Sequence, residues 1–189
     1  MRRLLIPIAA LAAVLAIPAG ASAYTLGVSD QQASTFTNPL FAPLKFKAAR
    51  YITPYDVLES PSDKAQLEAW VAGAHAAHQK ILISFEHSHR SNSRARKMPS
   101  VAAYTKELKK FKKAFPSIKE ISPWNEVNRC QRVIAGSVQG QPTCNSPKRV
   151  AQYYMAARKV WPGKTIVGID ILDEQNVNKT IKFLKSFLR

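Results

Sequence analysis

Short apolar runs alternate with amphipathic helical segments along most of this chain. The apolar runs predict strands over 24–29, 47–53, 80–85, 118–122 and 164–172. Apolar residues recur at helical spacing in the segments that begin at 62, 99, 147 and 176. Each strand with its helix takes about 30 residues, and right-handed crossovers between such units produce a parallel sheet with helices outside it.

The first strand helps to decide how such a sheet closes. A doubly wound nucleotide-binding sheet usually has a glycine-rich turn after this strand, whereas Gly27 is the single glycine of residues 27–31. We therefore predict an α/β fold of the parallel TIM-barrel type. An intact barrel has eight strands in about 250 residues. About five βα units over 24–189 therefore predict an incomplete barrel.

The first 23 residues have the three regions of a secretory signal peptide. Two arginines precede an apolar run over 4–17, and the small residues of 21–23 form a cleavage site. The apolar run is shorter than the roughly 20 residues of a membrane span, and no later stretch competes with it. We therefore expect cleavage after Ala23 and a secreted protein without a membrane span.

The chain is strongly basic, with a formal charge of +16 that falls by two, to +14, without Arg2 and Arg3. This charge suits solvated lysines on outer helices, or an acidic or cell-wall polysaccharide as partner. Aromatic residues do not alternate with the basic ones as a stacking groove requires, so we expect no nucleic-acid partner. Cys130 and Cys144 are the two cysteines of an exported chain, and we predict a disulfide between them.

Polar residues follow the predicted strand over 118–122. Trp124, Asn125 and Glu126 come at its carboxyl end, and Asn128 follows two positions later. In a parallel barrel the catalytic residues lie at the carboxyl ends of the strands. A carboxyl group beside amides and an aromatic ring suits sugar hydroxyls and protonation of a glycosidic oxygen. Alternatively, Glu126 caps the next helix and Asn125 holds a turn.

This segment resembles the acid/base motif Trp-Asn-Glu-Pro-Asn at the fourth strand of retaining glycoside hydrolases of clan A. Four of the five positions match, and Val127 replaces the proline. The resemblance implies that Glu126 is the general acid/base and that Asn125 holds the 2-hydroxyl of the sugar. Arg50 looks like the arginine that these enzymes carry on the second strand beneath the carboxylates, although it also suits a snorkelling position.

In clan A the nucleophilic glutamate stands on a seventh strand, and this sequence stops before any such strand. The resemblance therefore implies the N-terminal portion of a hydrolase. Glu86, Asp170 and Asp173 are the carboxylates of this chain that could substitute for the nucleophile.

The remaining strand ends carry further candidates for substrate contacts. Asp30 follows the first strand and either faces the barrel mouth or caps the following helix. His87 follows the third strand and is a candidate for a sugar hydroxyl. The spacing of Glu86, His87 and His89 fits no strong metal motif, and a third, distant ligand is not evident, so we predict neither a metal nor a cofactor.

Three functions compete on this sequence. The first is a secreted glycoside hydrolase-like protein that uses Glu126. The second is a non-catalytic carbohydrate-binding or cell-wall-binding module, suggested by the missing nucleophile and the positive charge. The third is an inactive remnant without a stable fold, because half of a barrel would expose strand edges and an apolar interior.

Overall fold

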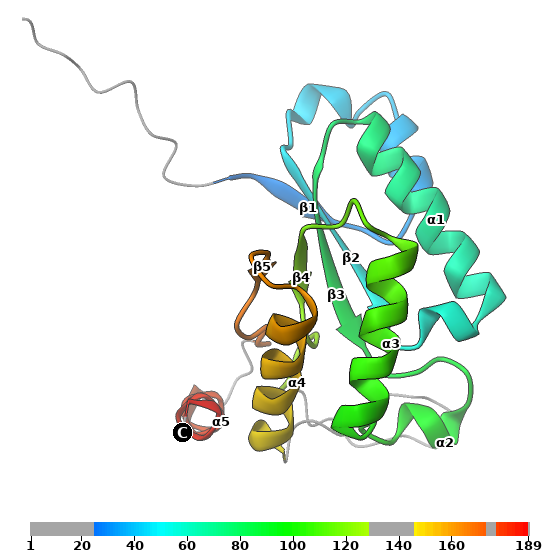
Figure 1. Ribbon diagram of the computed structural model, residues 1–189. Coiled ribbons are helices and arrows are strands. Elements are labelled where there is room, and N and C mark those ends of the chain that lie inside the picture. Colours follow the sequence, from blue (N-terminus) through cyan, green and yellow to red (C-terminus); the bar gives the residue numbers. More distant parts are fainter. Residues whose placement is uncertain (1–24, 129–145, 173–176, 189) are drawn as a thin grey trace, which may run out of the picture.

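The five predicted strands form one parallel sheet in their order along the chain. The computed structural model describes residues 25–128, 146–172 and 177–188. The sheet has the order β1-β2-β3-β4-β5, and every neighbouring pair is parallel (Figure 1). The strands are β1 (Gly27–Ser29), β2 (Ala48–Pro54), β3 (Lys80–Glu86), β4 (Glu120–Ser122) and β5 (Thr165–Ile166). The predicted α/β fold with successive parallel strands is confirmed, and it is consistent with an incomplete barrel.

The helices connect these strands and lie on one face of the sheet (Figure 1). The α-helices are α1 (Pro61–Ala76), α2 (Asn92–Ala95), α3 (Val101–Ala114), α4 (Pro147–Val160) and α5 (Val177–Phe187). Short 3-10 helices are η1 (Ala33–Thr37), η2 (Ala42–Leu44) and η3 (Val57–Glu59). Helices α1, α3 and α4 cover the sheet, and α5 packs against α4. None of the helices in these described ranges combines the length and apolarity that crossing a bilayer requires.

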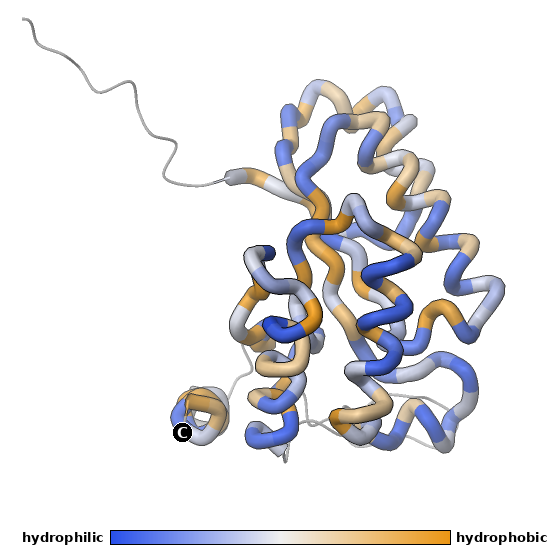
Figure 2. Tube along the Cα trace, viewed as in Figure 1, coloured by the Kyte–Doolittle hydropathy of each residue, from blue (hydrophilic) through white to orange (hydrophobic). Residues whose placement is uncertain are grey.

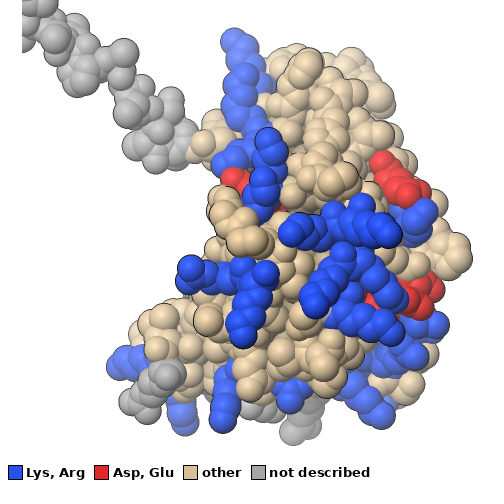
Figure 3. Space-filling view, viewed as in Figure 1, with Lys and Arg blue, Asp and Glu red and all other residues tan. Residues whose placement is uncertain are grey.

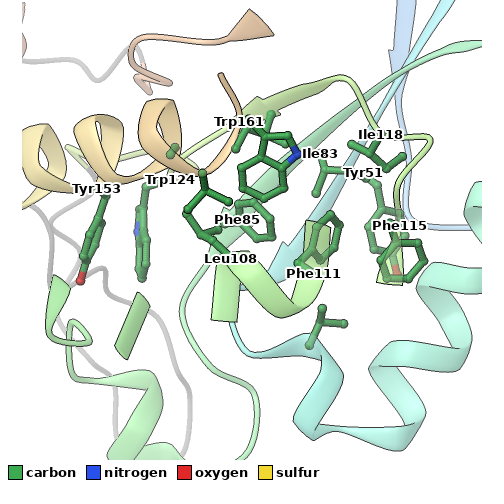
Figure 4. Packing of buried hydrophobic residues seen from close by; sticks show 14 of the residues in the cluster. Tyr51, Ile83, Phe85, Leu108, Phe111, Phe115, Ile118, Trp124, Tyr153 and Trp161 are labelled. Atoms are coloured by element: carbon green, nitrogen blue, oxygen red, sulfur yellow. The ribbon is translucent and has the colours of Figure 1, made fainter. Parts of the chain in front are cut away.

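The hydrophobic core lies between the sheet and this helical layer. Alternate strand residues point to opposite faces, and those facing the helices are buried. Strands carry apolar runs, whereas hydrophilic residues dominate the exposed side of α3 (Figure 2). The largest fully buried side chains include Trp70 and Tyr104. Figure 4 shows others of this group, namely Phe85, Phe111, Trp124 and Tyr153.

The opposite face of the sheet, which would be the barrel interior, carries many polar side chains. The strand register places Ser29 beside Arg50, and the Arg50 guanidinium reaches Ser84. Near the amino end of the same face, Lys80 and Glu120 form an ion pair at 2.6 Å. An inactive remnant was expected to expose an apolar interior. Among the described strands this face is mixed: partly exposed apolar side chains of β2 and β3 lie between polar and ion-paired groups, which can face water at little cost.

Two predicted boundaries differ from the structure for local reasons. The helix expected to start at Pro99 starts after Ser100, whose hydroxyl accepts a hydrogen bond from the Ala103 amide at 3.1 Å. The Pro99 carbonyl instead accepts from Tyr153 Oη at 2.6 Å. The strand expected over 164–172 is regular only at β5, although the Val167 amide still donates to the Ile121 carbonyl at 2.8 Å.

Candidate functional site

Arg50 is the centre of a polar cluster at the sheet face opposite the helices. Its Nε donates to Ser84 Oγ at 2.9 Å, and its Nη2 donates to Asp170 Oδ2 at 2.6 Å. The same Nη2 contacts Asn125 Oδ1. The guanidinium therefore joins β2, β3 and the segments after β4 and β5. Because a guanidinium presents its donors in a fixed plane, it can hold an amide and a carboxylate in a defined arrangement.

Backbone hydrogen bonds extend the parallel order past the ends of the strands. The Asn125 amide donates to the Phe85 carbonyl at 2.7 Å, and the Val127 amide donates to the Asp170 carbonyl at 3.0 Å. Glu126 lies between these two bonds, with a φ of 43° in the left-handed region. This turn brings Glu126 beside Asp170, and the Glu126 backbone donates a hydrogen bond to the Asp170 carboxylate.

Opposing effects act on the pKa of the Asp170 carboxyl group. Burial raises its pKa most, the Arg50 guanidinium lowers it, and the negative charge of Glu126 raises it again. The net result is a pKa for Asp170 above its ordinary value. Two carboxyl groups with unequal environments are the arrangement that acid/base chemistry on one substrate uses.

A cavity of about 380 Å³ opens at this carboxyl edge. Asn125 and Glu126 line it together with Glu86 and His89 from the end of β3 and with Gln31 after β1. A hollow of about 900 Å³ elsewhere is lined mainly by α4, with residues of α3 and α5, and its surface is mostly apolar. We place the candidate site at the smaller cavity, because its amide and carboxylates converge on one space.

Two residues that the sequence pattern suggested for sugar contacts are buried beneath the site. Trp124 is 1% exposed, and its ring stacks on that of Tyr153 with centroids 5.3 Å apart (Figure 4). Asn128 is also buried, and its amide group exchanges hydrogen bonds with the backbone of Leu172 at 2.8 and 2.9 Å. In this structure, Trp124 and Asn128 support the loop that carries Glu126 and do not form a platform for a sugar.

Asp30 and His87 also have local partners. The Asp30 carboxylate accepts hydrogen bonds from the Gln32 amide at 2.7 Å and from Thr35 Oγ1 at 2.8 Å, so it holds the turn into η1. Gln32 is the N-cap of η1, so Asp30 is not the capping residue itself, although its carboxylate fixes the turn before that helix. His87 is half-buried beside Glu86, with Nδ1 3.5 Å from Oε2, whereas His89 lines the cavity.

The structure adds partners that the sequence analysis did not assign. Ser84 and Asp170 hold Arg50, and Asp63 from α1 reaches His89. Ser84 lies on β3 two positions past Leu82, the residue in register with Arg50, so the strand register could have indicated it. Cys130, Cys144, Asp173 and the predicted signal peptide lie outside the described residues.

Comparison with known proteins supports the fold but assigns no family. No protein-family model and no curated protein sequence matches the chain. Among solved structures, it is similar to xylanase B from Clostridium stercorarium F9, with a TM-score of 0.52 and 11% sequence identity. The match covers 87% of this chain and 58% of the xylanase chain. At this identity the likeness shows a shared TIM-barrel type of fold alone.

Proposed function

We propose that this protein is a glycoside hydrolase-like protein that binds a glycan at the carboxyl edge of its sheet, with Glu126 as general acid/base. One observation carries the proposal: the Arg50 guanidinium joins the Asn125 amide to Asp170 directly beside Glu126. The cavity there has room for part of a sugar chain. The fold similarity to a xylanase suggests a polysaccharide built of β-linked sugars as substrate.

In the proposed chemistry, Glu126 donates its proton to the glycosidic oxygen as the bond to the anomeric carbon breaks. A carboxylate roughly 5 to 5.5 Å away attacks that carbon and forms a glycosyl ester. Glu126, now ionised, then takes a proton from the water that hydrolyses the ester. Asn125 would donate a hydrogen bond to the 2-hydroxyl, and Arg50 would hold that amide in place.

The identity of the attacking carboxylate is the open part of this proposal. The resemblance assigns it to a strand beyond those of this chain, and the chain spans 58% of the xylanase. Asp170 is the described carboxylate whose pKa responds to the charge of Glu126. Burial raises the pKa of Asp170, but the Arg50 guanidinium opposes that rise, so Asp170 is our candidate for the second carboxylate within this chain.

Hydrolysis of xylo-oligosaccharides and β-glucan oligomers tests this proposal directly. General acid catalysis contributes about 10²- to 10⁴-fold, so Glu126→Gln should lower the rate by that amount. Asp170→Asn should do the same if Asp170 attacks the substrate. Glu120→Gln, at the amino end of the same sheet face, is the matched control and should hydrolyse like the wild type. Equal rates for Glu126→Gln and the wild type would rule out the acid/base role.

A non-catalytic binding module is the second candidate, and the charge distribution favours it. Lysine and arginine side chains spread over the helical face of the molecule, whereas few acidic groups lie there (Figure 3). The exposed lysines of α3 include Lys106, Lys109, Lys112 and Lys113. Binding to an acidic polysaccharide should therefore weaken as salt rises. Salt-insensitive binding to such a polymer would remove the electrostatic part of this alternative.

Export and the disulfide also belong to the proposal. We propose that the protein is secreted after cleavage at Ala23 and that Cys130 and Cys144 are bonded. The support is the composition of the first 23 residues and the oxidising environment of exported proteins. The mass of the secreted protein would test both, since it should correspond to a chain that starts at Tyr24 and lacks two thiol hydrogens.

A further inference from the structure

Three side chains at the end of β3 gather their ligand atoms around one point. Glu86, His87 and His89 each offer an oxygen or nitrogen atom, and these atoms all lie within 4.8 Å of one another. His89 Nε2 is 3.1 Å from Glu86 Oε1, and His87 Nδ1 is 3.5 Å from Glu86 Oε2. Ligands of a tetrahedral zinc ion, bound at about 2.0 to 2.1 Å, are separated by roughly 3.3 Å. The observed spacings lie on either side of that value.

A fourth residue, from a different element, holds the outer side of this cluster. Asp63, in the first turn of α1, places Oδ1 3.4 Å from His89 Nδ1. Histidines that bind metals with one ring nitrogen usually donate the other N–H to a carboxylate, which fixes the ring. Asp63 therefore fits the role of an outer carboxylate that orients His89, and the proposed ligands all come from the segment at the end of β3.

The cluster is partly buried and has one side open to the cavity. The side chains of Glu86 and His87 are 16% and 13% exposed, whereas that of His89 is 41% exposed. Glu86 and His89 also line the cavity that contains Glu126. Three protein ligands with a remaining position open to solvent form the arrangement of zinc sites that keep a water molecule or take a substrate oxygen.

We propose that Glu86, His87 and His89 bind a divalent transition-metal ion, with Zn²⁺ as the best fit, and that Asp63 orients His89. Two imidazoles and a carboxylate suit Zn²⁺ better than Mg²⁺ or Ca²⁺, which prefer oxygen ligands alone. The ion would add positive charge to a cavity wall that otherwise presents carboxylates. A sugar hydroxyl could then fill the open coordination position.

A metal-free arrangement is the competing explanation of the same contacts. Hydrogen bonds from Glu86, more than those from Asp63, raise the pKa of His89 in the absence of a metal. A protonated His89 would then hold both carboxylates by itself. The two explanations differ in one result, since only the first gives saturable metal binding that depends on His87 as well as on His89.

Calorimetric titration of the untagged full chain with Zn²⁺ distinguishes them without any glycan. We expect one site per chain, at least 100-fold weaker binding in His87→Ala and in His89→Ala, and about 10- to 100-fold weaker binding in Asp63→Asn. His75 lies at the other end of α1 from Asp63, so His75→Ala is the matched histidine control and should bind like the wild type. The double variant Cys130→Ser/Cys144→Ser should also retain binding, which excludes the cysteines as ligands.

A second readout protects the test against variants that fold poorly. Far-UV circular dichroism should be the same for the wild type and for His89→Gln, which keeps the size and polarity of the side chain. Co²⁺ in place of Zn²⁺ should give the visible absorption of a four-coordinate ion in the wild type and lose it in His89→Gln. The absence of saturable Zn²⁺ binding, or equal affinity in the His87 and His89 variants, would overturn this proposal. Either result would leave the role of Glu126 untouched.

Discussion

Removal of Arg50 should leave a partly buried carboxylate without its partner. Arg50→Met keeps most of the aliphatic length but removes the donors to Ser84, Asn125 and Asp170. Asp170 then retains its charge in a position where its side chain is 17% exposed and where Glu126 repels it. The decrease in the free energy of unfolding should therefore be larger than that for replacing an ordinary surface arginine.

The magnitude follows from the geometry of the ion pair. At 2.6 Å and an effective dielectric constant of about 20, the attraction between Arg50 and Asp170 is roughly 6 kcal/mol before the cost of desolvation. Breaking a fully buried pair costs about 3 to 5 kcal/mol. Since Arg50 is 27% exposed, we expect the lower end, about 3 kcal/mol, for Arg50→Met. Near neutral pH, Asp170→Asn should change the free energy of unfolding little, because the amide still accepts a hydrogen bond and burial no longer acts on a charge.

A double-mutant cycle measured by urea unfolding tests this reasoning. With Asp170 already neutral, loss of Arg50 leaves no unpaired charge, so the double variant should lose about 1 kcal/mol, and the coupling free energy should be about 2 kcal/mol. The control cycle uses Lys80→Met and Glu120→Gln, a pair with the same 2.6 Å separation whose lysine is 64% exposed. Its coupling should stay below about 1 kcal/mol. Additive losses in the first cycle would refute the contact between β2 and the segment after β5.

Three further predictions concern the loop after β4 and its neighbours. Glu126→Asn should raise the free energy of unfolding by about 0.5 to 1 kcal/mol while abolishing hydrolysis, because asparagine tolerates the left-handed conformation better. Trp124→Ala should cost about 3 to 5 kcal/mol in urea unfolding, because it empties a buried site between aromatic rings. The stability of the wild type relative to Asp170→Asn should fall as pH rises from below 3.8 through the higher folded-state pKa of Asp170.

Each of these three predictions has a result that contradicts it. Equal stability changes in Glu126→Asn and Glu126→Ala would show that the left-handed conformation costs nothing, since alanine does not relieve it. A small stability loss for Trp124→Ala together with weaker glycan binding would place its ring in the substrate site. For Asp170, the native state binds more protons within the stated window. If the stability of the wild type relative to Asp170→Asn rose with pH in that window, the effect of Arg50 on the pKa of Asp170 would outweigh that of burial.

The architecture was predictable because the apolar runs, the helical spacing and the residues at the helix starts all indicate the same elements. The apolar run of β3 was expected over 80–85 and forms over Lys80–Glu86, because the alternate residues Ile81, Ile83 and Phe85 are buried against the helices. The helices α1, α4 and α5 start within one residue of the predicted positions. Pro147 lies in the first turn of α4, where its lack of an amide hydrogen costs nothing.

Side-chain directions past the strand ends were not predictable in the same way. The sequence places Trp124, Asn125 and Glu126 after β4, but it does not show to which side of the sheet each side chain points. In the structure Trp124 enters the core, Asn125 reaches Arg50, and Glu126 adopts the left-handed conformation. The positive φ of a glutamate has no signature in a sequence pattern.

Contacts between distant elements were the other part that the sequence could not reveal. Asp63 belongs to the first turn of α1, where an acidic residue ordinarily complements the helix dipole. Its approach to His89 depends on how α1 packs across β2 and β3. Asp170 likewise meets Arg50 although β2 and β5 are not neighbours in the sheet. Their contact depends on how the whole sheet brings the segment after β5 toward β2.

The central claim is that a glycan binds at the carboxyl edge of the sheet beside Glu126. The most direct measurement is a nitrogen-15 NMR titration with xylo-oligosaccharides, following the side-chain resonances of Arg50 and Asn125. We predict saturable shifts of both, and little change for the backbone amides of Lys80 and Glu120 at the amino end. Saturable shifts at the amino end with none at Arg50 and Asn125 would contradict the claim.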